Sequence, residues 1–498
     1  MSPRSLVRRT VAAVAGGAVV AGGLMAVAPV PATHAAPAAP SAEASAAAAW
    51  LDGRVAGGLI DGNVSVTMDY ALSLDATGLD TPARVGGLVA GVDGGLADYL
   101  AGAFDRDAST AKAAYFYAAM EQDPRDAAGL DLVADTEGAL DAEGRLGDSG
   151  VYGQAWAVLA LNAAGSDDAG VATEALIDDQ CADGAWGWSC AGGQDIDYTA
   201  YSLLALRAAP ATPATASAIS SAVAFLKSKQ GATGGFGDSG DPTDAFYTPD
   251  NANTTGLAAW ALGASGETER AARASSWIAA HEVVALAGCG RGLDADHGAI
   301  AYSAVTLKEA VDAGGVPAEV TEEWTLASAQ ALAGLAYLPA AQPTVPTTFV
   351  DAGTTTSIAL AGARAGQQVC VTGLGAPQRL ISPASATFAV PAGTADHAVT
   401  VTYLGGSTTT TVKALDATKL KVKVPSTIKA KKKATIKVKG LAAGEPVTVK
   451  VGKKTATGTA NAKGVAKVKV KVKKKGKAKV KVVGAFPDRK GKATTRVR

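Results

Sequence analysis

Two carboxylates separated by a single residue are the side chains of this sequence best placed for acid chemistry. Asp195 and Asp197 stand in the run DIDYTA, at the beginning of an apolar segment with helical periodicity. A carboxyl group in such a place acts as a general acid when its surroundings poise it for proton transfer. The same residue types at a helix start also serve as N-caps, which accept hydrogen bonds from backbone N–H groups. The sequence leaves both roles, proton donor and helix cap, open for this pair.

Aromatic residues make up only 5% of the chain, yet many fall in apolar helical segments or in glycine-rich turns. A ring of aromatic side chains around the mouth of a helical barrel would form a pocket for a small apolar or sugar-like ligand. Ordinary packing between helices is the alternative explanation. The candidate ligand-binding residues, with one asparagine among them, are Trp156, Trp186, Trp188, Tyr198, Tyr201, Tyr247, Asn253, Trp260 and Tyr302.

Two clusters contain side chains that can bind metal ions. The first comprises Cys289, Asp294, Asp296 and His297. The second comprises Asp238, Asp241, Asp244 and Asp250. The first has donors that zinc accepts and the second has donors that calcium accepts, but neither has the spacing of a known site. We therefore expect polar turns at both places, and neither a metal ion nor a cofactor.

A short apolar run recurs six times and predicts a repeated structural unit. The runs are ALSL, AYFY, VLAL, LLAL, AWAL and AVTL, which end at residues 74, 117, 161, 206, 262 and 307. Four of the five steps between run ends are 43 to 45 residues and the remaining one is 56. A period in this range is typical of a supersecondary unit repeated along the chain. We expect two helices in each unit, one carrying the apolar run and one lying between the runs.

A second motif recurs in phase with these units and points to a family. It has the form QxxxGx followed by an aromatic residue, and its two copies are Gln180, Gly184 and Trp186, and Gln230, Gly234 and Phe236. This motif resembles the QxxxGxW repeat of the squalene cyclase family. Over residues 45–340 the chain therefore resembles the α/α toroids of terpenoid cyclases and protein prenyltransferases. The resemblance implies six inner and six outer helices in a closed barrel with a central cavity.

The resemblance also offers a reaction. The run DIDYTA is similar to the DxDDTA motif of proton-initiated terpene cyclases, in which the middle aspartate protonates an alkene; that residue would be Asp197. The chain departs from the motif at Tyr198, where the family has a third acid. Such cyclases pair two helical barrels, and this chain has one. We expect a non-catalytic toroid that binds a small apolar ligand or a surface protein, with an isoprenoid enzyme using Asp197 as the alternative.

Composition divides the chain into successive parts. An arginine-bearing start followed by an apolar stretch and small residues predicts a secretory signal, and alternation of apolar and lysine residues near the end predicts half-buried strands. The predicted parts are a signal peptide at 1–36, a leader at 37–44, an α/α toroid at 45–340, a linker at 341–347, a small β-sandwich at 348–412 and a lysine-rich immunoglobulin-like module at 413–498.

Charge is strongly divided along the chain. Residues 411–498 contain 28 basic and three acidic residues, whereas the preceding 410 residues contain 18 basic and 43 acidic ones. Dense lysine without interleaved aromatic residues favours attraction to phosphate-rich polyanions over reading of nucleic-acid bases. We expect 413–498 to contact anionic cell-envelope polymers and no specific nucleic acid. A solubilising lysine surface that blocks edge pairing is the alternative.

The four cysteines favour an oxidising compartment. Cys181 and Cys190 bracket one short loop, so we predict a disulfide between them. Cys289 and Cys370 either stay reduced or join the helical part to the next domain. Together with the signal sequence, these features predict a secreted, extracellular protein in contact with the cell wall. We expect no transmembrane segment after signal cleavage, and the export route stays open between the general and twin-arginine pathways.

Overall fold

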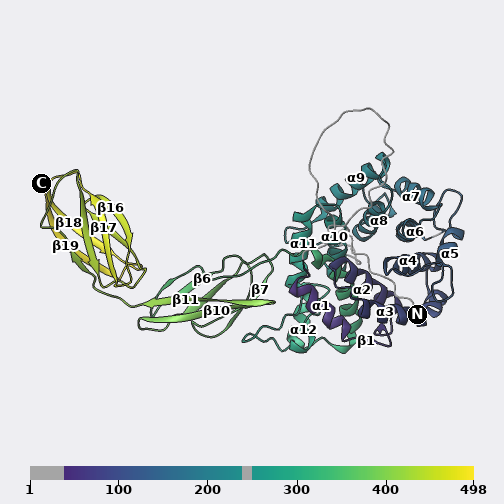
Figure 1. Cartoon of the computed structure of the whole chain (residues 1–498), viewed down its shortest axis with the longest axis horizontal. Helices are drawn as coiled ribbons and strands as arrows, with labels where there is room; N and C mark the ends of the chain where they lie inside the picture. The colour runs from purple at the N-terminus through teal and green to yellow at the C-terminus, as the bar shows by residue number, and fades with distance from the viewer. Residues whose placement is uncertain (1–38, 148, 238–249) are drawn as a thin grey trace, which may run out of the picture.

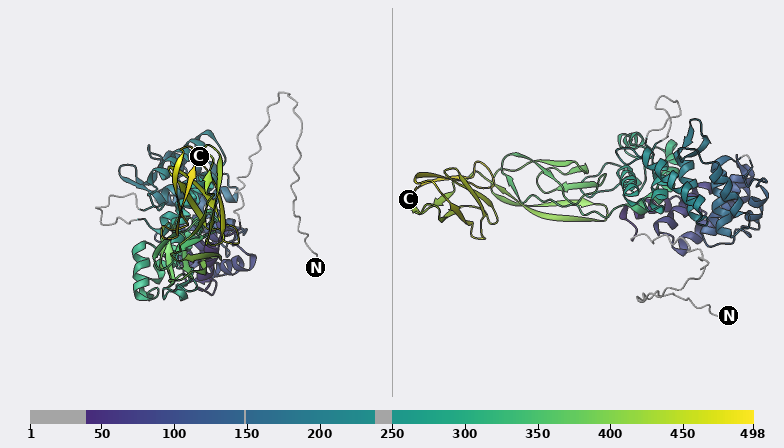
Figure 2. Two further views of the ribbon diagram at one scale, coloured as in Figure 1. Left: turned by 90° about the vertical axis from the view of Figure 1, so that its left-hand side faces the viewer. Right: turned by 90° about the horizontal axis from the view of Figure 1, so that it is seen from above.

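The computed structural model describes residues 39–147, 149–237 and 250–498. The predicted signal peptide and Tyr247 lie outside these ranges. Helices form the first part of the described chain and strands form the rest, so the molecule is an all-α toroid followed by all-β immunoglobulin-like sandwiches (Figure 1). The toroid occupies one end of an elongated molecule and the C-terminus occupies the other (Figure 2). Among the described residues, no helix has both the length and the apolar character that a membrane span requires.

Six inner helices form the wall of the ring, and six outer helices pack against them (Figure 1). The inner helices, in ring order, are α2 (Val64–Thr77), α4 (Arg106–Ala119), α6 (Gly150–Ala164), α8 (Ile196–Ala208), α10 (Ala252–Ala264) and α13 (Thr321–Ala331). The outer helices are α3 (Pro82–Gly102), α5 (Leu132–Gly138), α7 (Ala169–Asp178), α9 (Pro213–Lys229), α11 (Thr268–His281) and α1 (Ala42–Asp52).

The ring closes where the first and last inner helices meet. Helix α13 packs between α10 and α2, and the Ser73 hydroxyl of α2 donates a 2.7 Å hydrogen bond to the carbonyl oxygen of Ala329 in α13. The outer partner of α13 is α1, which comes from the opposite end of the helical sequence. Residues more than 250 positions apart therefore complete one repeat unit.

The sixth apolar run does not line the ring. It lies in α12 (Ala304–Ala313), of which only Leu307 and Ala310 are buried, while Val305 is 60% exposed. Lys308 and Asp312 on the same helix form an exposed ion pair with each other. Because charged residues narrow its apolar face to a single stripe, α12 packs at the periphery. Helix α13, whose run TLASAQA is less apolar, takes the inner place.

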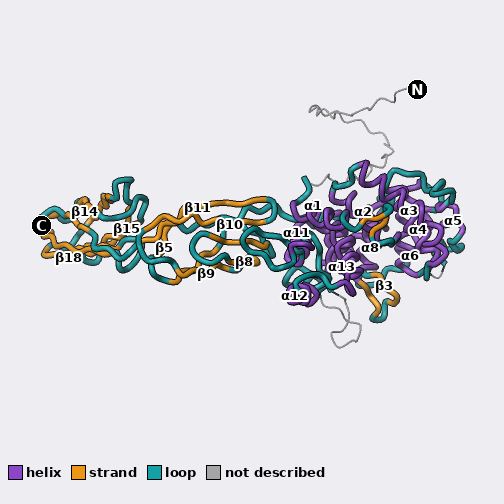
Figure 3. The backbone as a smooth tube through the Cα atoms, turned by 90° about the horizontal axis from the view of Figure 1, so that it is seen from below, coloured by secondary structure: helices purple, strands orange, loops and turns teal. Residues whose placement is uncertain are grey.

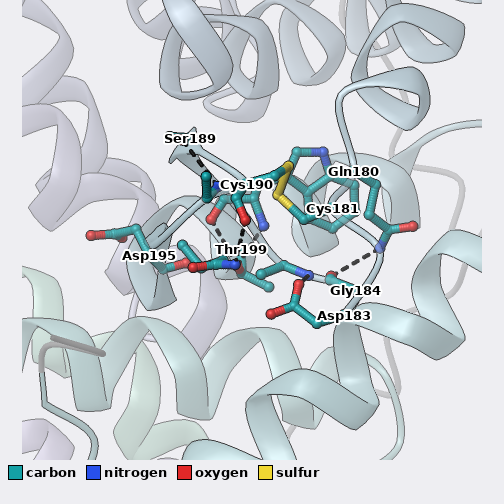
Figure 4. The surroundings of a disulfide bond; sticks show 12 residues. Gln180, Cys181, Asp183, Gly184, Ser189, Cys190, Asp195 and Thr199 are labelled. Carbon is teal, nitrogen blue, oxygen red and sulfur yellow. Dashed lines mark hydrogen bonds between the residues drawn. A yellow bond between two sulfur atoms is a disulfide. The ribbon is translucent and has the colours of Figure 1, made fainter. Parts of the chain in front are cut away.

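The QxxxGx-aromatic motif joins neighbouring outer helices. Gln180, just after α7, donates from Nε2 to the carbonyl of Gly184 at 2.9 Å (Figure 4). The same nitrogen donates to the carbonyl of Ala218 in α9, also at 2.9 Å. Gly184 has a φ of +91°, and an added Cβ would lie 2.4 Å from the carbonyl oxygen of Ser221. Glycine is therefore required for the close approach of the turn to α9.

The second copy of the motif repeats this geometry one unit later. Gln230 donates from Nε2 to the carbonyls of Gly234 at 3.0 Å and Arg270 in α11 at 2.9 Å. The aromatic residue of each copy, Trp186 or Phe236, is fully buried, and its backbone N–H donates to a threonine hydroxyl at the start of the next inner helix. The glutamine amide thus fixes the spacing of two outer helices, while the aromatic ring fills the layer beneath them.

Replacing Gln230 with alanine is expected to lower the free energy of unfolding by about 1–3 kcal/mol, because two carbonyls lose their shared amide donor. Urea denaturation of the full chain measures this change. Gln122→Ala is the matched control, since the Gln122 amide donates to the carbonyl of Met120, two residues away, and so joins no two helices. Equal stability of the two variants would contradict the role assigned to the motif.

Two β-sandwiches follow the toroid in line (Figure 3). The first has sheets β5-β11-β10-β7-β8 and β6-β9, with strands β5 (Phe349–Asp351), β6 (Thr355–Ala359), β7 (Gln368–Thr372), β8 (Gln378–Ile381), β9 (Ser385–Ala389), β10 (Ala395–Tyr403) and β11 (Gly406–Leu415). The second has sheets β12-β14-β17 and β13-β19-β18-β15-β16, with strands β12 (Lys421–Lys423), β13 (Thr427–Ile428), β14 (Lys433–Lys439), β15 (Pro446–Val451), β16 (Lys454–Thr459), β17 (Val465–Lys471), β18 (Gly476–Val483) and β19 (Lys490–Val497).

A covalent and polar junction attaches the first sandwich to the toroid. Cys289 of the helical part and Cys370 of β7 form a disulfide, which decides between the two states that the sequence left open. Arg379 of β8 donates to the carbonyls of Val284 at 2.7 Å and Cys289 at 3.1 Å. Gln368 of β7 donates to the carbonyl of Glu282 at 2.6 Å. These contacts fix the first sandwich against the loop that follows α11.

One carboxyl group at this junction is buried in an unfavourable setting. Glu282 is fully buried, and within the described residues neither of its carboxyl oxygens has a hydrogen-bond partner. Burial raises the pKa of Glu282 well above its usual range, and the nearby carboxylate of Glu43 raises it further, against the opposing effect of Arg364. Arg364 itself forms a buried ion pair with Glu43. Glu282 is therefore protonated over a pH range in which an exposed glutamate is ionised.

This raised pKa predicts a specific dependence of stability on pH. Above about pH 4.3 the unfolded chain releases the Glu282 proton while the folded chain keeps it, so stability falls as pH rises toward the folded-state pKa. Glu282→Gln should remove this contribution and be more stable than the wild type at pH 7, as measured by thermal unfolding from pH 4 to 8. An unchanged pH profile in the variant would show that Glu282 titrates normally.

Candidate functional site

A cavity of about 160 Å³ lies in the centre of the ring. Five inner helices contribute to its wall: α2, α6, α8, α10 and α13. Its lining residues are Asp69, Leu72, Ser73, Tyr152, Trp156, Asp197, Tyr198, Tyr201, Asn253, Leu257, Trp260 and Gln330. The cavity thus has an aromatic wall together with carboxylate and amide groups.

The structure brings together part of the predicted ligand-binding set. Trp156, Tyr198, Tyr201, Asn253 and Trp260 all line the cavity. Residues from three different repeat units therefore meet in one place. The sequence could propose these residues individually, but the ring brings them into contact with a shared space.

The other predicted aromatic residues lie elsewhere. Trp186 is fully buried between helices, and its Nε1 donates to the carbonyl of Leu176 at 2.7 Å. Trp188 is 74% exposed on the hairpin of β3 (Trp186–Ser189) and β4 (Gly193–Asp195). Tyr302 lies in the segment before α12, where its carbonyl accepts from the backbone N–H of Ala252. Regular alternation would put Trp186 and Trp188 on the same face, because they are two residues apart on β3. The pairing of β3 with β4 is irregular between Gly187 and Ser189, which gives the two rings different surroundings.

The two aspartates of the run DIDYTA have different surroundings. Asp195 is the N-cap of α8, and its carboxylate accepts from the backbone N–H of Tyr198 at 2.9 Å. Asp197, in the first turn of α8, lines the cavity. The β3–β4 hairpin that leads into α8 is tied to the end of α7 by the Cys181–Cys190 disulfide (Figure 4). The disulfide thus restrains the segment that presents both carboxylates.

A buried ion pair beside the cavity was not anticipated from the sequence. Lys112 of α4 lies 2.6 Å from Asp69 of α2, and the two side chains are only 5% and 8% exposed. Gln330 of α13 donates to the other carboxylate oxygen of Asp69 at 3.1 Å, and Ser65 accepts from Lys112 at 2.9 Å. Asp69 and Lys112 could have been recognised in the sequence, because each is a charged residue within an otherwise apolar helical segment.

The electrostatics of this cluster follow from burial. Desolvation alone would lower the pKa of Lys112, but the charge of Asp69 more than reverses this, so its pKa lies above the ordinary value. Burial also raises the pKa of Tyr201 well above its usual range, with smaller contributions from Asp69, Tyr152 and Asp197. The lysine is therefore charged and the tyrosine neutral at physiological pH.

Aromatic rings pack into one wall of the cavity. The ring centroids of Trp156 and Tyr201 are 4.9 Å apart, and Tyr152 meets Tyr201 edge to face at 5.5 Å and Tyr198 at 6.0 Å. Lys112 lies 5.7 Å from the ring centroid of Trp156. The wall is therefore a mutually packed cluster that offers a limited apolar surface to a ligand.

The size of the cavity limits what it can hold. A cavity of about 150 Å³ accommodates one benzene molecule, and the space here is similar, at about 160 Å³. An isoprenoid substrate is several times larger. The cavity as it stands suits a small molecule or a few water molecules bound to Asp69, Asp197 and Gln330.

Lys112→Met should destabilise the toroid by about 3–5 kcal/mol, because it leaves the Asp69 carboxylate buried without its cation. Adding Asp69→Leu to that variant should recover most of the loss, since an apolar pair of similar volume avoids the cost of burying a charge. Urea denaturation of both variants measures the two changes. A single variant as stable as the wild type would mean that Asp69 gains solvent or a proton at little cost.

A second candidate site is the lysine surface of the C-terminal sandwich. On β17, Ala466, Val468 and Val470 are buried, while the lysines that alternate with them are exposed. This confirms the prediction of half-buried strands with lysine facing outward. The same alternation continues on β14, β15 and β18, so both outer faces of the sandwich carry lysine.

Lysines on neighbouring strands lie directly opposite one another. Such pairs destabilise a sheet, by an amount comparable to the roughly 0.2–1 kcal/mol that favourable cross-strand pairs contribute. The basic pairs are Lys421 with Lys439, Lys423 with Lys437, Lys437 with Lys467, Lys433 with Lys471, Lys450 with Lys481, Lys481 with Lys492 and Lys477 with Arg496.

Acidic partners within this sandwich are scarce. Within the described residues 419–498, Arg489 and Glu445 form an ion pair at 2.7 Å. Both side chains are almost fully buried, and Arg489 also donates to the carbonyl of Asp416 at 2.6 Å. The acid Glu445 thus supports the fold at the base of the sandwich and does not offset the surface lysines.

The two clusters of possible metal ligands were expected to be polar turns, and only the first lies wholly within the described residues. Across residues 39–147, 149–237 and 250–498, no group of three His, Cys, Asp or Glu side chains is arranged to hold a metal ion. In the first cluster Cys289 is oxidised, and Asp296 accepts from the backbone N–H of Val316 at 3.0 Å. Three members of the second cluster, Asp238, Asp241 and Asp244, lie outside the described residues.

No family model and no curated protein matches this sequence. Among solved structures, the chain is similar to the ent-copalyl diphosphate synthase from Streptomyces platensis, with 18% identity, a TM-score of 0.38, and coverage of 55% of this chain and 50% of the synthase chain. It is similar to fibronectin(III)-like modules of CbhA from Clostridium thermocellum, with 12% identity, a TM-score of 0.21, and coverage of 31% and 93%. It is also similar to a Ca²⁺-stabilized adhesin of an Antarctic bacterium, with 17% identity, a TM-score of 0.15, and coverage of 32% and 49%. The chain thus spans half the length of the synthase.

Proposed function

We propose that this protein is a secreted, non-catalytic toroid protein held at the cell envelope by its C-terminal sandwich, which binds anionic polymers. The observation that carries this proposal is the set of directly opposed lysines on both outer faces of that sandwich. The two ammonium groups of each opposed pair repel each other, and a polyanion bound over the strands would offset that repulsion. Binding releases the counterions of the polymer, which makes the interaction strong at low salt.

The remainder of the chain supports a position outside the cell. Two disulfides, Cys181–Cys190 and Cys289–Cys370, favour an oxidising compartment. The amino-terminal sequence has the features of a secretory signal. In this arrangement the toroid is the part that presents its cavity or its outer surface to a small ligand or to a surface protein.

The alternative of an isoprenoid enzyme has one observation in its favour, namely that Asp197 lines the cavity. Three observations weigh against it. Asp195 is engaged as a helix cap, and Tyr198 stands where the resembling motif has a further acid. The cavity volume of about 160 Å³ is also far below that of an isoprenoid chain. We therefore assign Asp197 a place in a small-ligand cavity and no catalytic step.

The envelope-binding proposal predicts salt-sensitive binding of the full chain to isolated cell walls. The protein should sediment with the walls at low salt, and its affinity should fall about a thousandfold between 50 and 200 mM salt if about six anionic groups are contacted. Walls stripped of their anionic polymers serve as the control and should retain little protein. Binding that survives both high salt and stripped walls would overturn the proposal.

A further inference from the structure

We propose that a lysine-lined hollow at the tip of the C-terminal sandwich is a binding groove for a linear phosphate chain, such as a poly(polyol phosphate). This inference rests on the proposed polyanion binding and assigns it to one place. The hollow has a volume of about 690 Å³. Its lysines are Lys450, Lys453, Lys454, Lys473, Lys474, Lys475, Lys477, Lys479 and Lys481.

Three elements build the groove. Lys450 on β15 and Lys481 on β18 lie directly opposite each other across the sheet. Gly452 and Lys453 form the turn between β15 and β16, and residues 472–475 connect β17 to β18. The groove is therefore walled by a hairpin turn and a loop, with a sheet face between them.

The groove lies at the end of the sandwich that points away from the toroid. Arg489, just before β19, contacts the carbonyl of Asp416 in the link to the first sandwich, so the beginning of β19 faces the toroid. Gly476, at the start of β18, pairs with Val497 at the end of β19, next to the C-terminus (Figure 1). The loop 472–475 adjoins Gly476 and so belongs to this far end. A ligand that is part of a large surface can reach the groove without colliding with the toroid.

The lining determines the class of ligand. Besides lysine, it contains only Val451, Gly452, Val472 and Ala478. It has no aromatic ring on which a base could stack, which weighs against single-stranded nucleic acid. It has no hydroxyl or amide side chain to recognise sugar hydroxyls, and no arginine fork to bind a carboxylate through two parallel hydrogen bonds. Recognition therefore depends on ammonium groups and a small apolar floor, which fits a slim chain of phosphates.

The spacing of the lysines fits such a chain. Lys477, Lys479 and Lys481 alternate along β18, and residues two apart on a strand are separated by about 7 Å. A short polyol between successive phosphates places their charges at a comparable interval. Each phosphate of an extended chain can then meet one ammonium group as it follows the strand, while lysines of the turn and the loop approach from the sides.

The test compares two triple variants of the full chain that remove the same charge. The groove variant is Lys453→Gln, Lys475→Gln and Lys479→Gln; the control is Lys419→Gln, Lys463→Gln and Lys469→Gln, which lie outside both the groove and the opposed lysine pairs named above. All six lysines are exposed, so neither variant disturbs the core. The probes are fluorescent poly(glycerol phosphate), poly-glutamate of equal charge and an oligodeoxynucleotide, with binding measured by anisotropy at several salt concentrations.

The groove variant should lose about a hundredfold in affinity for poly(glycerol phosphate) at 0.1 M salt, because each lost phosphate contact changes the slope of log K against log salt by about 0.7. The control variant should lose less than about tenfold, since its lysines act only through a screened field. Equal losses in both variants would overturn the groove and keep the proposed function. No loss in either would overturn both. Binding of poly-glutamate or the oligonucleotide as tight as that of poly(glycerol phosphate) would overturn the phosphate-chain assignment.

Discussion

The carboxylate of Asp69 is the point on which the ring depends. It lies on α2, pairs with Lys112 of α4 and accepts from Gln330 of α13. Three inner helices thus converge on one buried charge, including the two that close the ring. A buried charge requires partners at defined distances, so this cluster tolerates little variation in how α13 meets α2. The apolar contacts of the alanine-rich helices supply most of the burial, but they have no direction and allow one helix to shift along another. The hydrogen bonds and the ion pair of Asp69 hold α2, α4 and α13 at one relative position.

The toroid and the C-terminal sandwich differ in where their charged side chains lie and in whether these are paired. In the toroid, Lys112 and Asp69 beside the cavity are buried and paired with each other. In the C-terminal sandwich most lysines are exposed and several lie opposite one another, whereas Glu445, one of the two acidic residues at positions 419–498, is fully buried beside Arg489. The fold of this sandwich therefore depends on a valine-rich interior, while its surface is left with a strong field of one sign. Such a surface is costly in isolation and favours association with a partner of opposite charge.

The sequence predicted the parts that depend on local pattern. Period-two alternation predicted the lysine-bearing strands, and the apolar runs predicted the inner helices α2, α4, α6, α8 and α10. The prediction that the sixth run forms an inner helix was wrong, because Lys308 and Asp312 leave α12 with a narrow apolar face. The pairing of Asp69 with Gln330 was beyond sequence analysis, because it joins residues from opposite ends of the ring. Placement of Trp186 in the core and of Trp188 at the surface likewise depended on the irregular pairing of β3 with β4, which no sequence pattern showed.

The order of the domains along the chain determines how far the toroid lies from the lysine groove. The first sandwich is locked to the toroid by the Cys289–Cys370 disulfide and by Arg379. The lysine groove lies at the far tip of the second sandwich, beyond the buried Arg489 at its base. A molecule anchored through that tip projects its toroid outward by the length of two sandwiches, above the polymer layer. The toroid cavity is then exposed to the solvent outside the polymer layer. Shorter sandwiches would bring the toroid closer to that layer, although the cavity and the lysine groove would keep their own residues.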